Sequence, residues 1–215
     1  MTVALQRIDA RLPDAAVLAR AAERMRRGLL VAYPTETFYG LGCDARMAAA
    51  VDRIFLAKGR PDRMALPLIA GETDAVLLCA RHISGTARRL MAAFWPGPLT
   101  LVLEAADDLP PRLLGGGATV GVRVSPHPVA AALARLLGGP IVATSANRFG
   151  APPPLSATEV LDAMGDDVAM ILDAGATTGG NASTVLDVTV DPPRLIRAGA
   201  VGVGAIEQAL GHRLG

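Results

Sequence analysis

Apolar residues recur at two spacings along the chain, and these spacings divide it into short helices and strands. After Asp14, which can cap a helix, apolar residues return every three to four positions and predict a helix that ends near Gly28. The same reasoning predicts further helices at 47–57, 84–94, 126–137, 156–165 and 203–210. Short apolar runs predict strands at 29–33, 66–70, 99–103, 119–124, 140–144, 168–172, 184–190 and 194–197. Because helices and strands alternate without long linkers, we expect one α/β domain with a twisted mixed sheet flanked by helices.

Local signals fix several of these boundaries. Ser125 is expected to cap the helix at 126–137, with Pro126 in its first position, where proline is favoured. Ser156 and Glu159 have the spacing of a capping box. Pro34 is expected to end the strand at 29–33.

Composition limits the function without identifying it. About half of the 215 residues are apolar (51%), yet no run approaches the ~20 residues that span a bilayer. The first residues lack the apolar stretch of a signal peptide, so we expect a cytoplasmic protein. A net charge of +1 and 3% aromatic residues argue against a protein that binds nucleic acid tightly by itself. Cys43 and Cys79 are expected to be buried free thiols.

Four polar stretches follow predicted elements, at residues 33–42, 58–61, 144–147 and 179–185. Ligands of open α/β sheets bind where such loops meet beyond the strand ends. We therefore expect these four stretches to line one polar cleft. In the first stretch, Thr35, Glu36 and Thr37 also fit ordinary turn chemistry.

Cationic residues are the most informative part of these stretches. Lys58 is the single lysine among 21 Lys and Arg residues. Its retention indicates that this position requires a compact positive charge, as phosphate recognition often does. Its survival by chance, or a role at a helix end together with Arg60, remains open. Arg123 lies between valines on a predicted strand. It suits either a carboxylate or phosphate ligand, or a solvent-facing edge strand.

The remaining polar residues are interpreted as ligand-binding groups. Ser145 has no GxSxG context and no histidine placed to activate it, so Ser145 and Asn147 are expected to donate or accept hydrogen bonds. The histidines show no metal-ligand spacing, and no dedicated metal site is expected.

Seven motifs in order resemble the YrdC-like family of threonylcarbamoyl-AMP synthases, in its short single-domain form. They are YPTETFYGLGCDA, KGRP with LPLIA, FWPGPLTLVL, VGVRVSPHP, TSAN with FG, STVLDV and IRAGAV. The resemblance covers residues 10–205 or thereabouts. It implies that residues 1–215 form a single YrdC-like domain with a large concave, positively lined cleft.

The resemblance also implies a reaction. L-Threonine, bicarbonate and ATP, with Mg²⁺ carried by the nucleotide, would give threonylcarbamoyl-AMP and pyrophosphate, which makes the protein a nucleotidyltransferase. The product would supply a separate transferase complex that makes N6-threonylcarbamoyladenosine in tRNA, with a weak tRNA contact allowed. Lys58 and Arg60 are implied as catalytic residues. Implied ATP-binding residues are Lys58, Arg60, Thr119, Ser145, Asn147 and Arg197, and implied threonine-binding residues are Thr35, Arg123, Ala143 and Ser183.

Two other functions remain to be compared with this one. The first is an RNA-binding module of the same fold without nucleotide chemistry. The second is a carbamoyl-adenylate domain like that of hydrogenase maturation carbamoyltransferases, which lie in much longer chains. The chain departs from the resemblance at Met64, where many members carry a polar residue. From sequence alone, Lys58→Arg is expected to cost activity with little change in thermal stability.

Overall fold

The computed structural model describes residues 3–215 and divides their strands over two mixed sheets. The first sheet has the order β1-β9-β2-β3-β8. Its strands are β1 (Ala4–Arg7), β9 (Met170–Asp173), β2 (Val31–Pro34), β3 (Tyr39–Gly42) and β8 (Thr144–Ser145). The second sheet has the order β11-β10-β5-β6-β4-β7. Its strands are β11 (Arg194–Arg197), β10 (Thr184–Asp187), β5 (Leu99–Glu104), β6 (Thr119–Val124), β4 (Leu68–Ala70) and β7 (Ile141–Val142).

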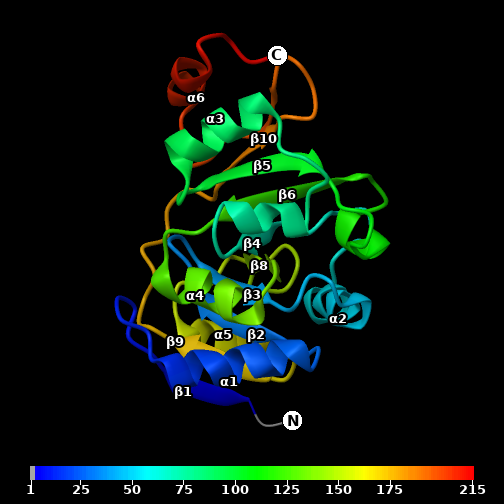
Figure 1. Ribbon diagram of the computed structural model, residues 1–215. Helices are drawn as coiled ribbons and strands as arrows, with labels where there is room; N and C mark the ends of the chain where they lie inside the picture. The colour runs from blue at the N-terminus through cyan, green and yellow to red at the C-terminus, as the bar shows by residue number, and fades with distance from the viewer. Residues whose placement is uncertain (1–2) are drawn as a thin grey trace.

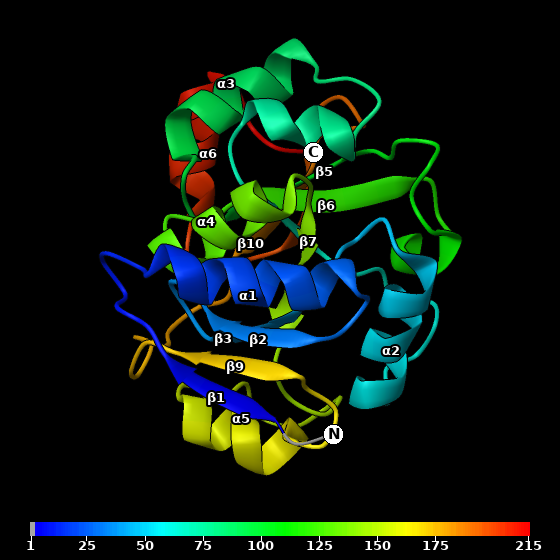
Figure 2. The same cartoon turned by 60° about the horizontal axis from the view of Figure 1, so that its bottom comes forward.

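Six α-helices and two short 3-10 helices accompany these sheets within the described residues. They are α1 (Ala15–Arg26), α2 (Ala48–Lys58), α3 (Gly85–Phe94), α4 (Pro128–Leu137), α5 (Ala157–Met164), α6 (Val203–Leu210), η1 (Asp74–Leu78) and η2 (Pro111–Leu114). Figure 1 shows the sheet that contains β5 and β6 below α3 and α6, and Figure 2 shows α1 lying across β2 and β3. The predicted α/β class is confirmed, whereas the strands form two sheets in place of the single one expected.

Two apolar cores result from strands that are buried on both faces. Along β2, Val31 and Tyr33 pack with α1 and α4, while Ala32 points into the larger core with α2, α3, α5 and α6. A strand covered on both sides reads as a continuous apolar run rather than an alternating one. This burial explains why the sequence predicts these strands well but does not assign them to sheets. None of the helices between residues 3 and 215 combines the length and apolarity needed to cross a bilayer.

The predicted helix starts are largely confirmed. Asp14 Oδ1 accepts a hydrogen bond from the Val17 N–H at 2.9 Å, and Ser156 Oγ accepts from the Glu159 N–H at 3.2 Å. The other half of the capping box differs, because the Glu159 carboxylate accepts from the Leu155 N–H.

The predicted start of α4 is wrong by two residues. His127 is the cap, its Nδ1 accepting from the Val129 N–H at 3.3 Å, and Pro128 takes the first helical position. Ser125 accepts from the His127 N–H and therefore stabilises the turn before the helix.

Three differences among the strands matter for the site. The strand expected at 140–144 is two short strands, and β7 pairs with β4 while β8 pairs with β3 in the other sheet. Residues 39–42, expected within a polar loop, form β3, a buried strand paired antiparallel to β2. Pro34 is the last residue of β2 and lies opposite Tyr39 rather than outside the strand. The β2–β3 hairpin therefore presents the turn at 35–38 as a compact unit.

Candidate active site

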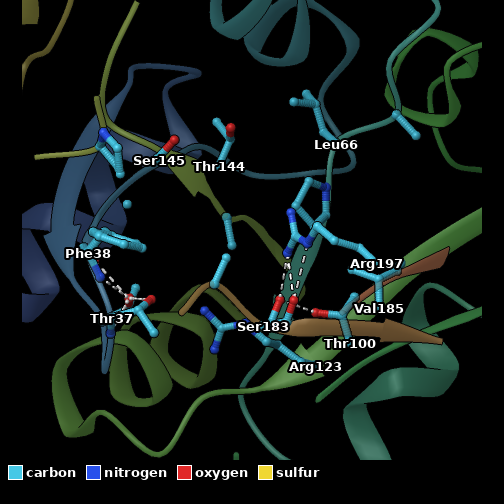
Figure 3. A pocket seen from close by; sticks show the side chains of 18 of the residues that line it. Thr37, Phe38, Leu66, Thr100, Arg123, Thr144, Ser145, Ser183, Val185 and Arg197 are labelled. Carbon is cyan, nitrogen blue, oxygen red and sulfur yellow. Dashed lines mark hydrogen bonds between the residues drawn. The ribbon is translucent and has the colours of Figure 1, made fainter. Parts of the chain in front are cut away.

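Residues from both sheets line one cavity of about 510 Å³. The turn between β2 and β3 and the strand β8 contribute from one sheet, and β5, β6, β10 and β11 contribute from the other. Figure 3 shows Thr37, Phe38 and Ser145 on one side of this cavity and Thr100, Val185 and Arg197 on the other. The four polar stretches expected to meet in one cleft all contribute residues to it.

The floor of the cavity follows from the alternation of side chains along β6. Thr119, Gly121 and Arg123 line the cavity, while the valines between them are buried in the core. A Cβ at Gly121 would lie 3.2 Å from Thr100 Cγ2. Glycine at this position therefore keeps the space above β5 and β6 open.

Arg123 does not face solvent from an edge strand. Its strand β6 lies between β5 and β4, and the residue is 8% exposed. The alternative of a solvent-facing edge arginine is wrong. Arg123 Nη1 lies 2.7 Å from Glu36 Oε1, but neither atom makes a hydrogen bond, so their contact is an ion pair without a directed N–H···O bond.

Arg197 and Ser183 form a polar network on the opposite wall. Arg197 Nη2 donates to the Ser183 carbonyl at 2.7 Å, and Ser183 Oγ lies 2.9 Å from Thr100 Oγ1. These contacts connect β11, β5 and the residues before β10 (Figure 3). Burial, and then the nearby charge of Arg123, lower the pKa of Arg197 from its ordinary value.

The turn at 35–38 is held by its own threonines. Thr35 Oγ1 donates to the Phe38 carbonyl at 2.7 Å and accepts weakly from the N–H groups of Thr37 and Phe38, both at 3.3 Å. Turn chemistry and cavity lining are thus two roles of the same residues, because Thr35, Thr37 and Phe38 all line the cavity.

Arg60 reaches the cavity from the turn after α2. Its Nη2 donates to the Ala65 carbonyl at 2.9 Å and its Nε to the Met64 carbonyl at 3.2 Å. Met64 contributes a backbone oxygen, and its side chain is not among the cavity-lining residues. Burial lowers the pKa of Arg60 from its ordinary value.

Lys58 lies behind the cavity wall rather than in it. Its side chain is buried, and Nζ donates to the carbonyls of Ser145 and Asn147 at 2.5 and 2.7 Å and to Asn147 Oδ1 at 3.3 Å. Burial, followed by the charge of Arg60, lowers the pKa of Lys58 to about 8. The ammonium group therefore connects the end of α2 to the loop at 145–147 and remains charged at neutral pH.

The structure brings most of the predicted site residues together. Thr35, Arg60, Thr119, Arg123, Ala143, Ser145, Ser183 and Arg197 line the cavity, whereas Lys58 and Asn147 do not. Asn147 is buried and donates from Nδ2 to the Ala151 carbonyl. Direct contact of Lys58 and Asn147 with a nucleotide stays a prediction.

Sequence reasoning missed several lining residues that no polar motif marks. Gly121, Val102 and Val185 line the cavity because their side-chain positions alternate along β6, β5 and β10, and only this alternation along a strand marks them in the sequence. Tyr39 lines it from β3, and burial raises the pKa of its hydroxyl to about 12. This hydroxyl donates to the Gly175 carbonyl at 2.7 Å.

The cavity is rich in cations. Among the residues that the structure describes, its lining contains three arginines and no aspartate or glutamate. Within residues 3–215, no group of three or more His, Cys, Asp and Glu side chains is arranged to hold a metal ion. Such a lining suits an anionic ligand with several oxygen atoms.

Comparisons with known proteins show the family to which this chain belongs. The family model Sua5_yciO_yrdC, described as "Telomere recombination", matches residues 23–199. The threonylcarbamoyl-AMP synthase of Pyrococcus abyssi is 43% identical over 192 residues, which cover 89% of this chain and 56% of that protein. The threonylcarbamoyl-AMP synthase of Thiobacillus denitrificans is 41% identical over 174 residues, covering 81% of this chain and 91% of that protein.

A solved structure also has a similar fold. The crystal structure of P. abyssi Sua5 complexed with L-threonine matches with a TM-score of 0.93 and 40% identity, over 98% of this chain and 62% of that one. The present chain thus spans little more than half the length of its Pyrococcus relative.

Proposed function

Because this chain belongs to the Sua5/YciO/YrdC family, we propose that it is a threonylcarbamoyl-AMP synthase, a nucleotidyltransferase that acts on L-threonine, bicarbonate and ATP. We also propose that residues 1–215 act as one catalytic domain. The names of its relatives support the activity. The complex of one relative with L-threonine supports the amino-acid substrate.

The observation that carries this proposal is the convergence of Arg60, Arg123 and Arg197 on a cavity whose lining contains no carboxylate. The reaction brings together two anions, a carboxylated amino acid and a nucleoside triphosphate. These anions repel one another in water. A site with three fixed cations offsets that repulsion and the charge that develops on the phosphates.

The proposed threonine subsite lies around Arg123. Its guanidinium carries N–H groups in a fork that suits a carboxylate. Thr35 and Ser183 supply hydroxyl groups, and Ala143 lines the subsite with a small side chain. These four residues come from different segments of the chain, so the subsite exists only in the folded protein.

The proposed nucleotide subsite uses Arg60, Arg197, Thr119 and Ser145, which line the remainder of the same cavity. Lys58 and Asn147 would support it from behind, because the lysine holds the carbonyl of Ser145. Mg²⁺ would arrive with the nucleotide. The lining offers it no carboxylate ligand, so phosphate oxygens would hold it.

The proposed chemistry requires no covalent enzyme intermediate. The amine of threonine combines with CO₂ derived from bicarbonate and loses a proton, giving a carbamate. A carbamate oxygen attacks the α-phosphorus of ATP, the bond to the β-phosphate oxygen breaks, and pyrophosphate leaves. The protein would supply alignment, which can contribute ~7–11 kcal/mol, together with the electrostatic stabilisation given by its arginines.

The product would pass to a separate transferase complex that modifies tRNA, which also supports a cytoplasmic location and allows weak contact with tRNA. The alternative of an RNA-binding module without nucleotide chemistry is not favoured, since the relatives described above carry the name of a synthase.

Pyrophosphate release from ATP tests the proposal. Release should require both threonine and bicarbonate, and omission of either should reduce it to the background rate. Mass spectrometry should detect threonylcarbamoyl-AMP in the complete mixture. Release that is independent of threonine, or tight tRNA binding without ATP turnover, would refute the proposed function.

A further inference from the structure

Glu36 is a charged side chain next to the cavity that the proposed reaction leaves without a role. It lies in the turn between β2 and β3, flanked by two threonines that line the cavity, although Glu36 itself does not line it. Its side chain is 16% exposed and its Oε1 makes no hydrogen bond. A carboxylate with a buried oxygen atom needs a nearby counter-ion, because desolvating a charge is costly.

We infer that Glu36 is a positioning residue, which orients Arg123 toward the cavity and so gives the site its selectivity for a free carboxylate on the amino-acid substrate. This inference rests on the proposed function and deepens it. Glu36 Oε1 lies 2.7 Å from Arg123 Nη1. Arg123 lines the cavity whereas Glu36 does not, so the carboxylate acts through the arginine.

Arg123 has few other constraints. Its side chain is 10% exposed, and among the described residues the ion pair of its buried Nη1 with Glu36 is not joined by any hydrogen bond that Arg123 donates. An arginine side chain loses ~2 kcal/mol of rotamer entropy when it is held in one conformation. The ion pair with Glu36 supplies that restraint while leaving the guanidinium free to donate to a ligand.

Glu36 is itself fixed in place. Ser125 Oγ donates to Glu36 Oε2 at 2.6 Å, and Thr178 Oγ1 donates to the Glu36 carbonyl at 3.0 Å. Ser125 follows β6, the strand that carries Arg123, whereas Glu36 follows β2 of the other sheet. The carboxylate therefore connects the two walls of the cavity and sets the distance between the threonine turn and the arginine.

The consequence concerns selectivity rather than overall affinity. With Nη1 held against Glu36, the remaining N–H groups of Arg123 would be available on the cavity side, and a substrate carboxylate would satisfy them. Without Glu36, the buried guanidinium has no counter-ion and would turn toward other oxygen acceptors, because an unpaired buried charge is strongly unfavourable. A ligand without a carboxylate would be affected far less, since it does not depend on that orientation.

Calorimetric titration with L-threonine and with L-threoninamide, which lacks the carboxylate, tests this inference. The parent protein should bind threonine at least 30-fold more tightly than threoninamide. In Glu36→Ala that ratio should fall about tenfold or more, and Glu36→Gln should restore part of it because its amide oxygen can still accept from Arg123. The control Glu23→Ala removes an exposed carboxylate on α1 and should leave the ratio unchanged.

The outcomes distinguish the positioning role of Glu36 from the proposed function. A ratio that stays at the parental value in Glu36→Ala, or threonine binding that becomes tighter, overturns the positioning role while leaving the proposed function intact. Failure of the parent protein to bind threonine overturns the proposed function. If Glu36→Ala does not fold, Ser125→Ala removes the hydrogen bond that fixes the carboxylate. That variant should lower the same ratio about threefold, and an unchanged ratio in it overturns the inference.

Discussion

Replacement of Lys58 by methionine tests whether this lysine stabilises the protein or contacts a ligand. Methionine is similar in length but carries no charge and donates no hydrogen bond. In the structure the lysine Nζ donates to two backbone carbonyls and to one amide oxygen, and the residue is 3% exposed. The substitution therefore leaves acceptors of the loop at 145–147 without their donor.

The expected loss of stability follows from these contacts. The two short bonds, at 2.5 and 2.7 Å, each contribute about 1.5–3 kcal/mol when the donor is charged. Against this stands the cost of burying the ammonium group. The lowering of the Lys58 pKa from 10.5 to about 8 puts that cost at about 3 kcal/mol. The two bonds together contribute about 3–6 kcal/mol, so the balance is a loss of about 1–2 kcal/mol at mid-range, which lowers the Tm of a chain of this size by about 2–8 °C.

Thermal melting followed by circular dichroism, together with pyrophosphate release, would measure both effects. Lys58→Met should melt several degrees below the parent and lose most of its activity. The control Arg63→Met removes an exposed cation from the same segment and should leave the Tm unchanged. Lys58→Arg should also lower the Tm, because the larger guanidinium must enter a closed site, and this reverses the expectation from sequence alone.

One result would refute this reasoning. If Lys58→Met melts within about 1 °C of the parent but loses tenfold or more in affinity for ATP, the amine is free of the loop and acts on phosphate. The ATP-binding role implied by the family resemblance would then be the correct one, and the contacts to Ser145 and Asn147 would not contribute to the free energy of unfolding.

Three further predictions follow from the same site. Because the pKa of Lys58 is lower in the folded than in the unfolded protein, the unfolded chain keeps the proton to higher pH, and the folded state becomes more stable as pH rises. Between pH 7.5 and 9.5, the free energy of unfolding of the parent, measured with urea, should increase by about 2 kcal/mol relative to that of Lys58→Met, and no increase would contradict the burial cost. Gly121→Val should place methyl groups in the cavity and abolish ligand binding in calorimetry while the Tm changes by only a few degrees, and retained binding would exclude this floor as part of the site. Arg123→Lys should weaken threonine binding at least tenfold and ATP binding less than threefold, since an ammonium cannot form two parallel bonds to a carboxylate; equal effects on both ligands would contradict the assignment.

Much of the fold could be predicted from local signals. Asp14 and Ser156 mark helix starts by capping chemistry that acts within three residues, and both are confirmed. Errors arise where tertiary contacts decide. Residues 140–144 are apolar throughout, so no periodicity reveals that β7 pairs with β4 and β8 with β3 in different sheets. At the start of α4, Ser125 Oγ accepts from the His127 N–H in the turn before the helix while donating to Glu36, far away in sequence, and His127 accepts from the Val129 N–H as the cap.

In the candidate site, too, local signals predict some residues, whereas tertiary contacts determine others. Polar residues after strand ends were identifiable, and those of the four stretches do converge on one cavity. Gly121 was not identifiable, since a glycine in a strand carries no chemical group and its role is to leave space. The partner of Arg123 was equally hidden, because the pairing with Glu36 joins two segments 87 positions apart, on different sheets.

Lys58 is unusual in the sequence because it supports the wall of the cavity, although it does not line the cavity itself. The retention of one lysine among arginines pointed to a need for a compact cation, and the structure gives such a need in the three acceptors around Nζ. A planar guanidinium presents its N–H groups in a rigid fork, whereas an ammonium group donates in three directions from one atom, which this cluster of acceptors requires. Since one acceptor is the carbonyl of Ser145, whose residue lines the cavity, the lysine influences the site by holding its wall. Substitutions of Lys58 should therefore affect activity and stability together, whereas Arg123→Lys, which keeps the positive charge beside Glu36, should act mainly on threonine binding.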